Sequence, residues 1–174
     1  MPLAVTHVLL TIIVVDLYRD YITKHKKLFT LHTLFIAGFA GLLPDIDIVI
    51  KMLAEFFSWN VPILLQHGGI SHTLIFSLIF LISGLILWKQ KKHKPAVIFF
   101  VISFGIFFHI FLDWLLGGGA HSGIMFFWPV STASFKIHLL NKVGLNNLPV
   151  ALDALVLLGW LWHEERKHKI SDFI

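Results

Sequence analysis

Apolar residues are grouped along the chain into five long runs, which polar segments separate. Each run has about 16–22 residues, close to what a helix needs to cross the hydrocarbon core of a bilayer. We therefore predict an all-α membrane protein with about five spans. In chain order, the predicted spans are Leu3–Tyr18, Phe29–Ile50, Ser71–Trp88, Pro95–Leu116 and Leu148–Trp162.

The segments between these runs indicate a single membrane-embedded helical domain over residues 1–174. An amphipathic connector of about 20 residues is expected between the second and third spans, and a longer segment, Ala120–Asn147, precedes the fifth. The first and fifth spans are short, so we expect them to be tilted, partial or packed inside the bundle. The first run lacks a preceding basic residue and a following cleavage site, so we do not expect a cleavable signal peptide.

The composition supports the membrane prediction and restricts the chemistry. Hydrophobic residues make up 57% of the chain and charged residues 14%, whereas soluble domains have about 45–50% and about 25%. Cysteine is absent, which excludes disulfides and thiolate metal ligands. The net charge of +4 lies in short clusters between apolar runs, so we expect no nucleic-acid partner.

The basic clusters predict the orientation in the membrane. Three of the polar segments hold 11 of the 14 Lys and Arg residues, and five spans place all three on one side. By the positive-inside rule this side is cytoplasmic, with the C-terminus, and the N-terminus lies outside the inner membrane. The clusters are Arg19, Lys24, Lys26 and Lys27; Lys89, Lys91, Lys92 and Lys94; and Arg166, Lys167 and Lys169.

Histidine and aspartate residues converge on the other, outer side. Ionisable side chains within a span cost about 2.5–3.5 kcal/mol on insertion scales, and they usually face the bundle interior and pair with something. Because several distant stretches bring such residues to one membrane depth, we predict a shared metal site. The candidate ligands are His7, Asp45, Asp47, His67, His72, His109, Asp113 and His121.

The strongest local pattern is the pair His109 and Asp113, which are four residues apart and share one helical face. That spacing suits two ligands of one metal, and a buried hydrogen-bonded pair is the alternative. Asp45 and Asp47 follow Pro44, where a helix is expected to end, and they could instead be a water-facing pair.

The segment 67–72 joins two histidines through a glycine turn, and these could also be ordinary loop histidines. We expect Ser71 to cap the third helix, so that His72 begins it. A lone histidine such as His7 is more often interfacial than a ligand, so the prediction depends on the convergence.

Ligation by imidazoles and carboxylates alone suits zinc, and also manganese or iron. Several carboxylates beside several imidazoles suggest more than one ion, and such sites hydrolyse phosphoesters. At a membrane surface, the natural substrate is a lipid headgroup.

Four motifs, taken in order, resemble those of the membrane-bound metal-dependent hydrolases, also described as LexA-regulated inner-membrane hydrolases. They are Thr6-His7, Leu43-Pro44-Asp45-Ile46-Asp47, His67-Gly-Gly-Ile-Ser-His72-Thr73 and His109-Ile-Phe-Leu-Asp113. Phe127-Trp128-Pro129 is similar to a further motif of that family. The resemblance covers nearly the whole chain.

The resemblance implies a distant similarity to zinc-dependent phospholipase C and P1 nuclease, which are all-helical phosphoesterases. It implies metal ligation by His7, one of Asp45 and Asp47, His67 or His72, and the His109–Asp113 pair; His121 is similar to a histidine of the soluble enzymes. The His and Glu pair that completes their three-metal site has no counterpart on the outer side. The resemblance therefore implies one or two ions.

These observations predict a membrane-bound hydrolase of phosphoesters in a lipid, lipid-linked or small-molecule substrate. Asp45 or Asp47 would orient the attacking water or act as the base. A metal-ion transporter is the first alternative, and it would need polar residues leading through to the cytoplasm. A structural protein whose helices are held together by metal is the second.

Overall fold

The computed structural model of the chain describes residues 4–23, 28–60, 62, 68–116, 123–144 and 149–168. Within these ranges the secondary structure is helical, apart from an isolated bridge between Ile124 and Phe135. The prediction of an all-α protein is therefore confirmed. The α-helices are α1 (Ala4–Leu17), α2 (Leu31–Ala40), α3 (Ile46–Phe56), α4 (Leu74–Lys89), α5 (His93–Leu116), α6 (Leu139–Lys142) and α7 (Pro149–His168), with a π-helix at Tyr18–Ile22 and a 3₁₀ turn at Ile70–His72.

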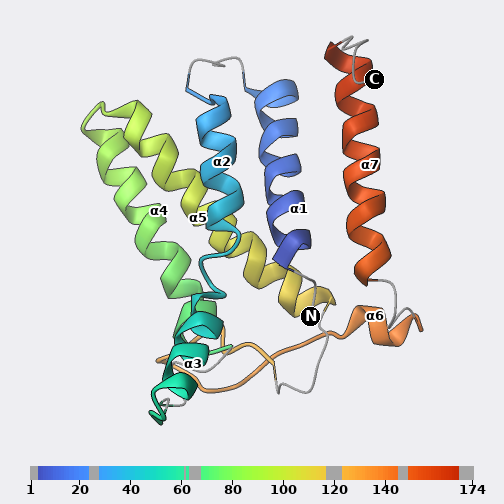
Figure 1. Ribbon diagram of the computed structural model, residues 1–174. Coiled ribbons are helices and arrows are strands. Elements are labelled where there is room, and N and C mark those ends of the chain that lie inside the picture. The colour runs from blue at the N-terminus through green and yellow to red at the C-terminus, as the bar shows by residue number, and fades with distance from the viewer. Residues whose placement is uncertain are drawn as a thin grey trace.

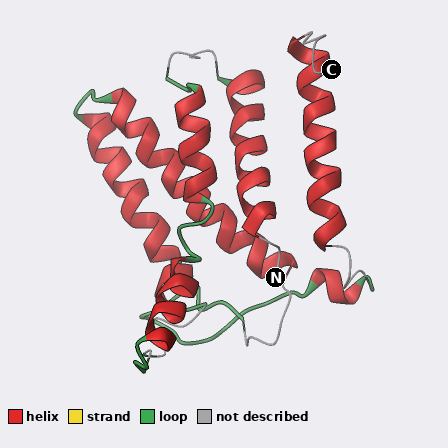
Figure 2. Cartoon of the chain, viewed as in Figure 1, coloured by secondary structure: helices red, strands yellow, loops and turns green. Residues whose placement is uncertain are grey.

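Helices α1, α2, α4 and α5 pack into a bundle, and α7 lies along α1 (Figure 1). Residues 123–138, which precede α6, cross one end of this bundle as loops, and α3 extends from the same end (Figure 2). The N-terminus lies near this end, whereas the C-terminus, the α4–α5 turn and the far end of α1 lie at the opposite end (Figure 1). The described members of the three predicted basic clusters lie after α1, in the α4–α5 turn and near the end of α7, so they share this end of the protein.

The number of spans is not confirmed. Among the described residues, only α5 is long and apolar enough to cross a membrane, and α2 and α4 are shorter apolar helices. The predicted second span is broken, because α2 ends at Ala40 and α3 begins at Ile46 after a turn. Pro44 lies in that turn; it lacks a backbone donor and disfavours helical geometry in the residue before it.

The expected cap of the third helix was wrong. Thr73, not Ser71, is the N-cap of α4, and its hydroxyl accepts a hydrogen bond from the amide of Phe76 at 3.3 Å. Ser71 lies in the preceding 3₁₀ turn, and His72 ends that turn. The turn is short, so it holds both side chains close to the start of α4.

Polar contacts attach α7 near both of its ends to α1 and to the π-helix that follows α1. The Thr6 hydroxyl donates to Asp153 at one end, and Lys167 pairs with Asp20 at the other. Leucines of α7 are exposed, Leu155 and Leu158 each by 63%. A helix held in this way leaves its apolar side available to lipid.

The core of the bundle consists of two apolar clusters of buried residues. The first lies in the half that contains the basic segments, and its members are Val15, Leu34, Ala37, Val97 and Val101. The second lies towards the other end, and its members are Ile106, Ile110 and Ile124.

Helix α2 approaches α5 closely at Gly105. A Cβ atom at this position would lie 2.6 Å from the Cβ of Ala40 and 3.1 Å from the amide nitrogen of Gly41. Small residues at membrane helix contacts allow such approaches. Gly105 therefore sets the position of the end of α2 relative to α5.

We expect Gly105→Val to reduce the free energy of unfolding by about 1–3 kcal/mol, because overpacking forces the two helices apart. Thermal unfolding in detergent measures the effect. Gly159→Val is the matched control, since a Cβ at Gly159 has no atom within 4 Å. Equal losses in the two variants would contradict this account of the α2–α5 contact.

Candidate metal centre

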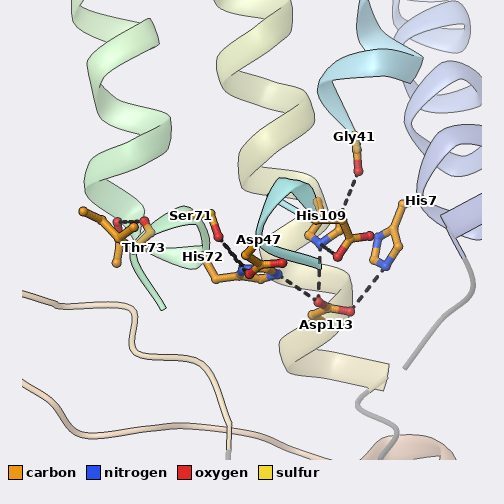
Figure 3. A network of polar contacts seen from close by, with 10 residues as sticks. His7, Gly41, Asp47, Ser71, His72, Thr73, His109 and Asp113 are labelled. Carbon is orange, nitrogen blue, oxygen red and sulfur yellow. Dashed lines mark hydrogen bonds and ion pairs between the residues drawn. The ribbon is translucent and has the colours of Figure 1, made fainter. Parts of the chain in front are cut away.

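Three helical elements bring histidines to the end of the bundle from which α3 extends (Figure 3). His109 and Asp113 lie one turn apart on α5, and His7 lies in the first turns of α1. The rings of His7 and His109 are stacked, with centroids 3.9 Å apart. The ring of His72 meets that of His109 edge-on at 5.2 Å.

The orientation of His109 is fixed by the backbone of α2. Its Nδ1 lies 2.6 Å from the carbonyl oxygen of Gly41, the C-cap of that helix. A carbonyl can only accept, so Nδ1 carries the proton and donates it. Nε2 then keeps its lone pair, and a backbone carbonyl of this kind is the usual outer partner of a metal-ligating histidine.

The carboxylate of Asp113 lies among the three imidazoles. Its Oδ1 is 3.3 Å from Nε2 of His7, and its Oδ2 is 3.4 Å from Nε2 of His109 and 3.5 Å from Nε2 of His72. Asp45 approaches from the other side, with its Oδ1 3.6 Å from Nε2 of His109.

These separations suit a shared cation better than direct hydrogen bonds. Hydrogen bonds from nitrogen to oxygen are typically about 2.7–3.2 Å long. Zinc bonds of about 2.0–2.1 Å in a tetrahedron place neighbouring ligand atoms about 3.3–3.4 Å apart. The imidazole and carboxylate atoms therefore have the spacing of ligands around one centre.

The hydrogen-bonding state of these atoms supports the same interpretation. Nε2 of His109 and both carboxylate oxygens of Asp113 are buried and make no hydrogen bond of normal geometry within the described part of the chain. Buried polar atoms in native proteins are nearly always satisfied, and exceptions call for an explanation such as an ion. A divalent cation would satisfy all three atoms together.

His72 is held from behind by Asp47. Nδ1 of His72 lies 3.2 Å from Oδ2 of Asp47, and the Ser71 hydroxyl donates to the same oxygen at 3.0 Å. Nε2 of His72 therefore points towards Asp113 (Figure 3). This is the carboxylate–histidine arrangement that orients metal ligands.

His72 is placed between two carboxylates, with Asp47 at Nδ1 and Asp113 at Nε2. Imidazole binds a metal ion in its deprotonated, neutral form, so a cation at Nε2 of His72 would compete with a proton there.

The donors form two overlapping groups, each compact enough for one ion. One consists of His7, His109 and Asp113, and the other of Asp45, His72 and His109. His109 belongs to both, so this cluster could hold one ion or two neighbouring ions. The described structure thus supports a metal-binding cluster without identifying the metal.

Among the described donors of the cluster, Asp45 is the most exposed. His72 and His109 are fully buried and Asp113 is nearly so, whereas the side chain of Asp45 is 18% exposed. Asp45 is also the N-cap of α3. A ligand from outside the protein would therefore reach the cluster beside the start of α3.

Of the predicted ligands, the structure brings together His7, Asp45, His72, His109 and Asp113. Asp47 contacts His72 and lies behind it, while His67 and His121 lie outside the described residues. Two contributors to the site were not predicted, the Ser71 hydroxyl and the Gly41 carbonyl. Ser71 could have been noticed from its place beside His72, but a backbone carbonyl leaves no signal in the sequence.

The fold and site define a class: a helical protein with apolar helices and a buried histidine–aspartate cluster at one end of its bundle. The chain belongs to the YdjM inner membrane protein family, whose family model matches residues 1–171. No curated protein and no solved structure gives a significant match.

This family membership confirms the predicted membrane localisation. It gives no activity, and the similarity to phospholipase C and P1 nuclease stays a prediction because no solved structure matches. The orientation and number of crossings also stay predictions.

We expect zinc to raise the unfolding temperature of the wild-type protein, because it would bind the folded cluster. Zinc at about 100 times its dissociation constant stabilises a folded protein by about 2.7 kcal/mol. His72→Ala should remove most of this stabilisation, as measured by thermal unfolding in detergent with and without zinc.

His163→Ala is the control, because His163 contacts Tyr21 and Glu164 away from the cluster. It should retain the zinc effect. Equal stabilisation of wild type and His72→Ala would place the zinc elsewhere.

Proposed function

We propose that this protein is a membrane-bound, metal-dependent hydrolase that cleaves phosphoesters in a lipid or lipid-linked substrate. The observation that carries the proposal is the convergence of imidazole and carboxylate atoms at ligand spacing, beside a partly exposed aspartate. The resemblance of the motifs to metal-dependent hydrolases supports the reaction class, and fold alone would not.

The donor set favours zinc, with manganese and iron as alternatives. His7, His72 and His109 offer nitrogen ligands, and Asp113 and Asp45 offer oxygen ligands. This mixture is typical of zinc hydrolase sites. When bound, the ion supplies Lewis acidity towards a phosphoryl oxygen and activates water.

Asp45 is the best candidate for the general base. It is the most exposed of the clustered donors, and its carboxylate lies on the side from which water and substrate would arrive. In hydrolysis, the oxygen of water attacks phosphorus and the bond from phosphorus to the leaving alcohol breaks. Asp45 would take the proton from the attacking water, and that proton would then pass to the oxygen of the leaving alcohol.

Asp47, the other predicted catalytic residue, is better suited to positioning. Its carboxylate contacts Nδ1 of His72 and the Ser71 hydroxyl, and it is buried. It would hold His72 in the orientation that ligates metal, without touching the substrate.

A groove between α4 and α5 supports a lipid substrate. It has a volume of about 450 Å³, and its lining is mostly apolar. Leu74 and Phe107 line the groove close to the level of the cluster along α4 and α5, although Phe107 and His109 face different sides of α5. An acyl chain could occupy the groove while its headgroup lies near the cluster.

The transport alternative would need polar groups between the histidines and the basic end. That half of the bundle holds the apolar cluster that contains Val15, Ala37 and Val101. Thr11, Asp16 and Thr33 are also buried there, so transport stays an alternative.

The structural alternative has one observation in its favour, because His72 and His109 are fully buried. A metal that only holds helices together would occupy such a closed site. The two functions differ in whether a substitution at Asp45 affects turnover.

We expect Asp45→Asn to reduce phosphoester hydrolysis by about 10²–10⁴-fold, the usual effect of losing a general base. The variant should still bind metal through the remaining donors. Release of product from a phospholipid and from bis-p-nitrophenyl phosphate, measured with zinc or manganese, tests the rate.

Glu55→Gln is the matched control, since Glu55 is an exposed carboxylate on α3 that pairs with Lys51. It should leave the rate unchanged. Wild-type protein that holds metal but hydrolyses neither substrate would favour the structural alternative.

A further inference from the structure

Helix α3 turns few apolar side chains towards the protein and exposes its large ones, the reverse of a helix that packs on a protein in water. Its buried positions are Asp47 and Ala54, and the side chain of Asp47 is committed to His72. Its large apolar side chains are exposed instead. They are Ile46, Ile48, Val49, Met52, Leu53 and Phe56.

The helical spacing separates the two kinds of side chain. At about 100° per residue, Asp47 and Ala54 share one side, and Met52 and Phe56 lie on the opposite side. Lys51 and Glu55 are restricted to one flank, where their side chains pair at 3.8 Å. The side of α3 that points away from the protein is therefore apolar, and Met52 and Phe56 are 62% and 80% exposed.

Aromatic residues follow at the end of the helix. Phe57 stacks on Trp59 with ring centroids 5.2 Å apart, and Phe56 meets Phe57 edge-on at 5.1 Å. Trp59 is 69% exposed. Tryptophan and other aromatic rings are enriched where a membrane meets water, so this end of α3 has the chemistry of an interface anchor.

From these observations we propose that the apolar face of α3 lies among the acyl chains of the membrane leaflet on the side of the metal centre. The apolar face is defined as Ile48, Val49, Met52, Leu53 and Phe56. The chain belongs to an inner-membrane family, so lipid already surrounds its apolar helices. An amphipathic helix with one charged flank is the kind that binds in the interfacial region.

The position of α3 beside the metal centre means that lipid contact along α3 also affects the site. Asp45 is the N-cap of α3, and α3 extends from the end of the bundle where the histidines lie (Figure 1). Lipid contact along α3 places the open side of the cluster near the phosphates of that leaflet. This consequence rests on the proposed function and specifies the substrate as a membrane phospholipid; the placement of α3 does not depend on it.

The absence of cysteine from the chain makes the placement measurable. Single cysteines at Met52 and Phe56, and matched controls at Lys51 and Glu55, carry a nitroxide in protein reconstituted into phosphatidylethanolamine–phosphatidylglycerol vesicles. Oxygen concentrates in the hydrocarbon, and a neutral nickel chelate stays in water. The ratio of their collision rates with each nitroxide reports its depth.

The ratio of oxygen to nickel collisions should be several-fold higher at Met52→Cys and Phe56→Cys than at Lys51→Cys and Glu55→Cys. Equally low ratios at all four positions would overturn the proposal, because α3 would then lie in water. Low collision rates with both reagents at Met52 and Phe56 would also overturn it, since a second copy or another protein would then cover the face.

A second measurement uses the unmodified chain and so does not depend on the folding of the variants. A phospholipid with a diazirine in its acyl chain should label residues 46–57 in reconstituted wild-type protein, as mapped by mass spectrometry. Labelling of the bundle without labelling of this segment would contradict the proposal. Neither measurement requires metal or turnover, so failure of the hydrolase proposal would leave their outcome unchanged.

Discussion

The structure depends on how the buried carboxylate of Asp113 is compensated. A lone carboxylate in an apolar interior is strongly disfavoured, and within a membrane helix it is rare unless paired. Here His7, His72 and His109 surround it at 3.3–3.5 Å. The three imidazoles come from distant parts of the chain, so this one charge links the start of α1, the turn before α4 and the end of α5.

The packing of α2 against α5 helps to position the residues around Asp113. The close approach at Gly105 brings the end of α2 against α5, one turn before His109. The carbonyl of Gly41 can then fix the His109 ring, and the break after α2 lets Asp45 face the same cluster. Thus the broken second span, which the apolar pattern did not predict, is what allows α2 and α3 both to contribute to the site.

Much of this site could be predicted, because burying an ionisable side chain in an apolar segment costs free energy unless it pairs with another polar group. Helical periodicity alone predicted that His109 and Asp113 share a face. The distribution of basic residues predicted that they lie at the same end as His7 and His72. The distinction between Asp45 and Asp47 could not be predicted, since both follow Pro44 and only the turn geometry places one beside His109 and the other behind His72. The apolar pattern alone could not separate α2 from α3, because both are hydrophobic; only Pro44 indicated that a helix ends there.

The central claim is that this cluster holds a divalent metal ion. The most direct test is the metal content of detergent-purified protein, measured by elemental analysis for the wild type beside a variant with both His109→Ala and Asp113→Ala. We predict near-stoichiometric zinc, manganese or iron in the wild type and its loss from the double variant. A folded wild-type protein without metal after reconstitution, or a double variant that retains the metal, would contradict the account.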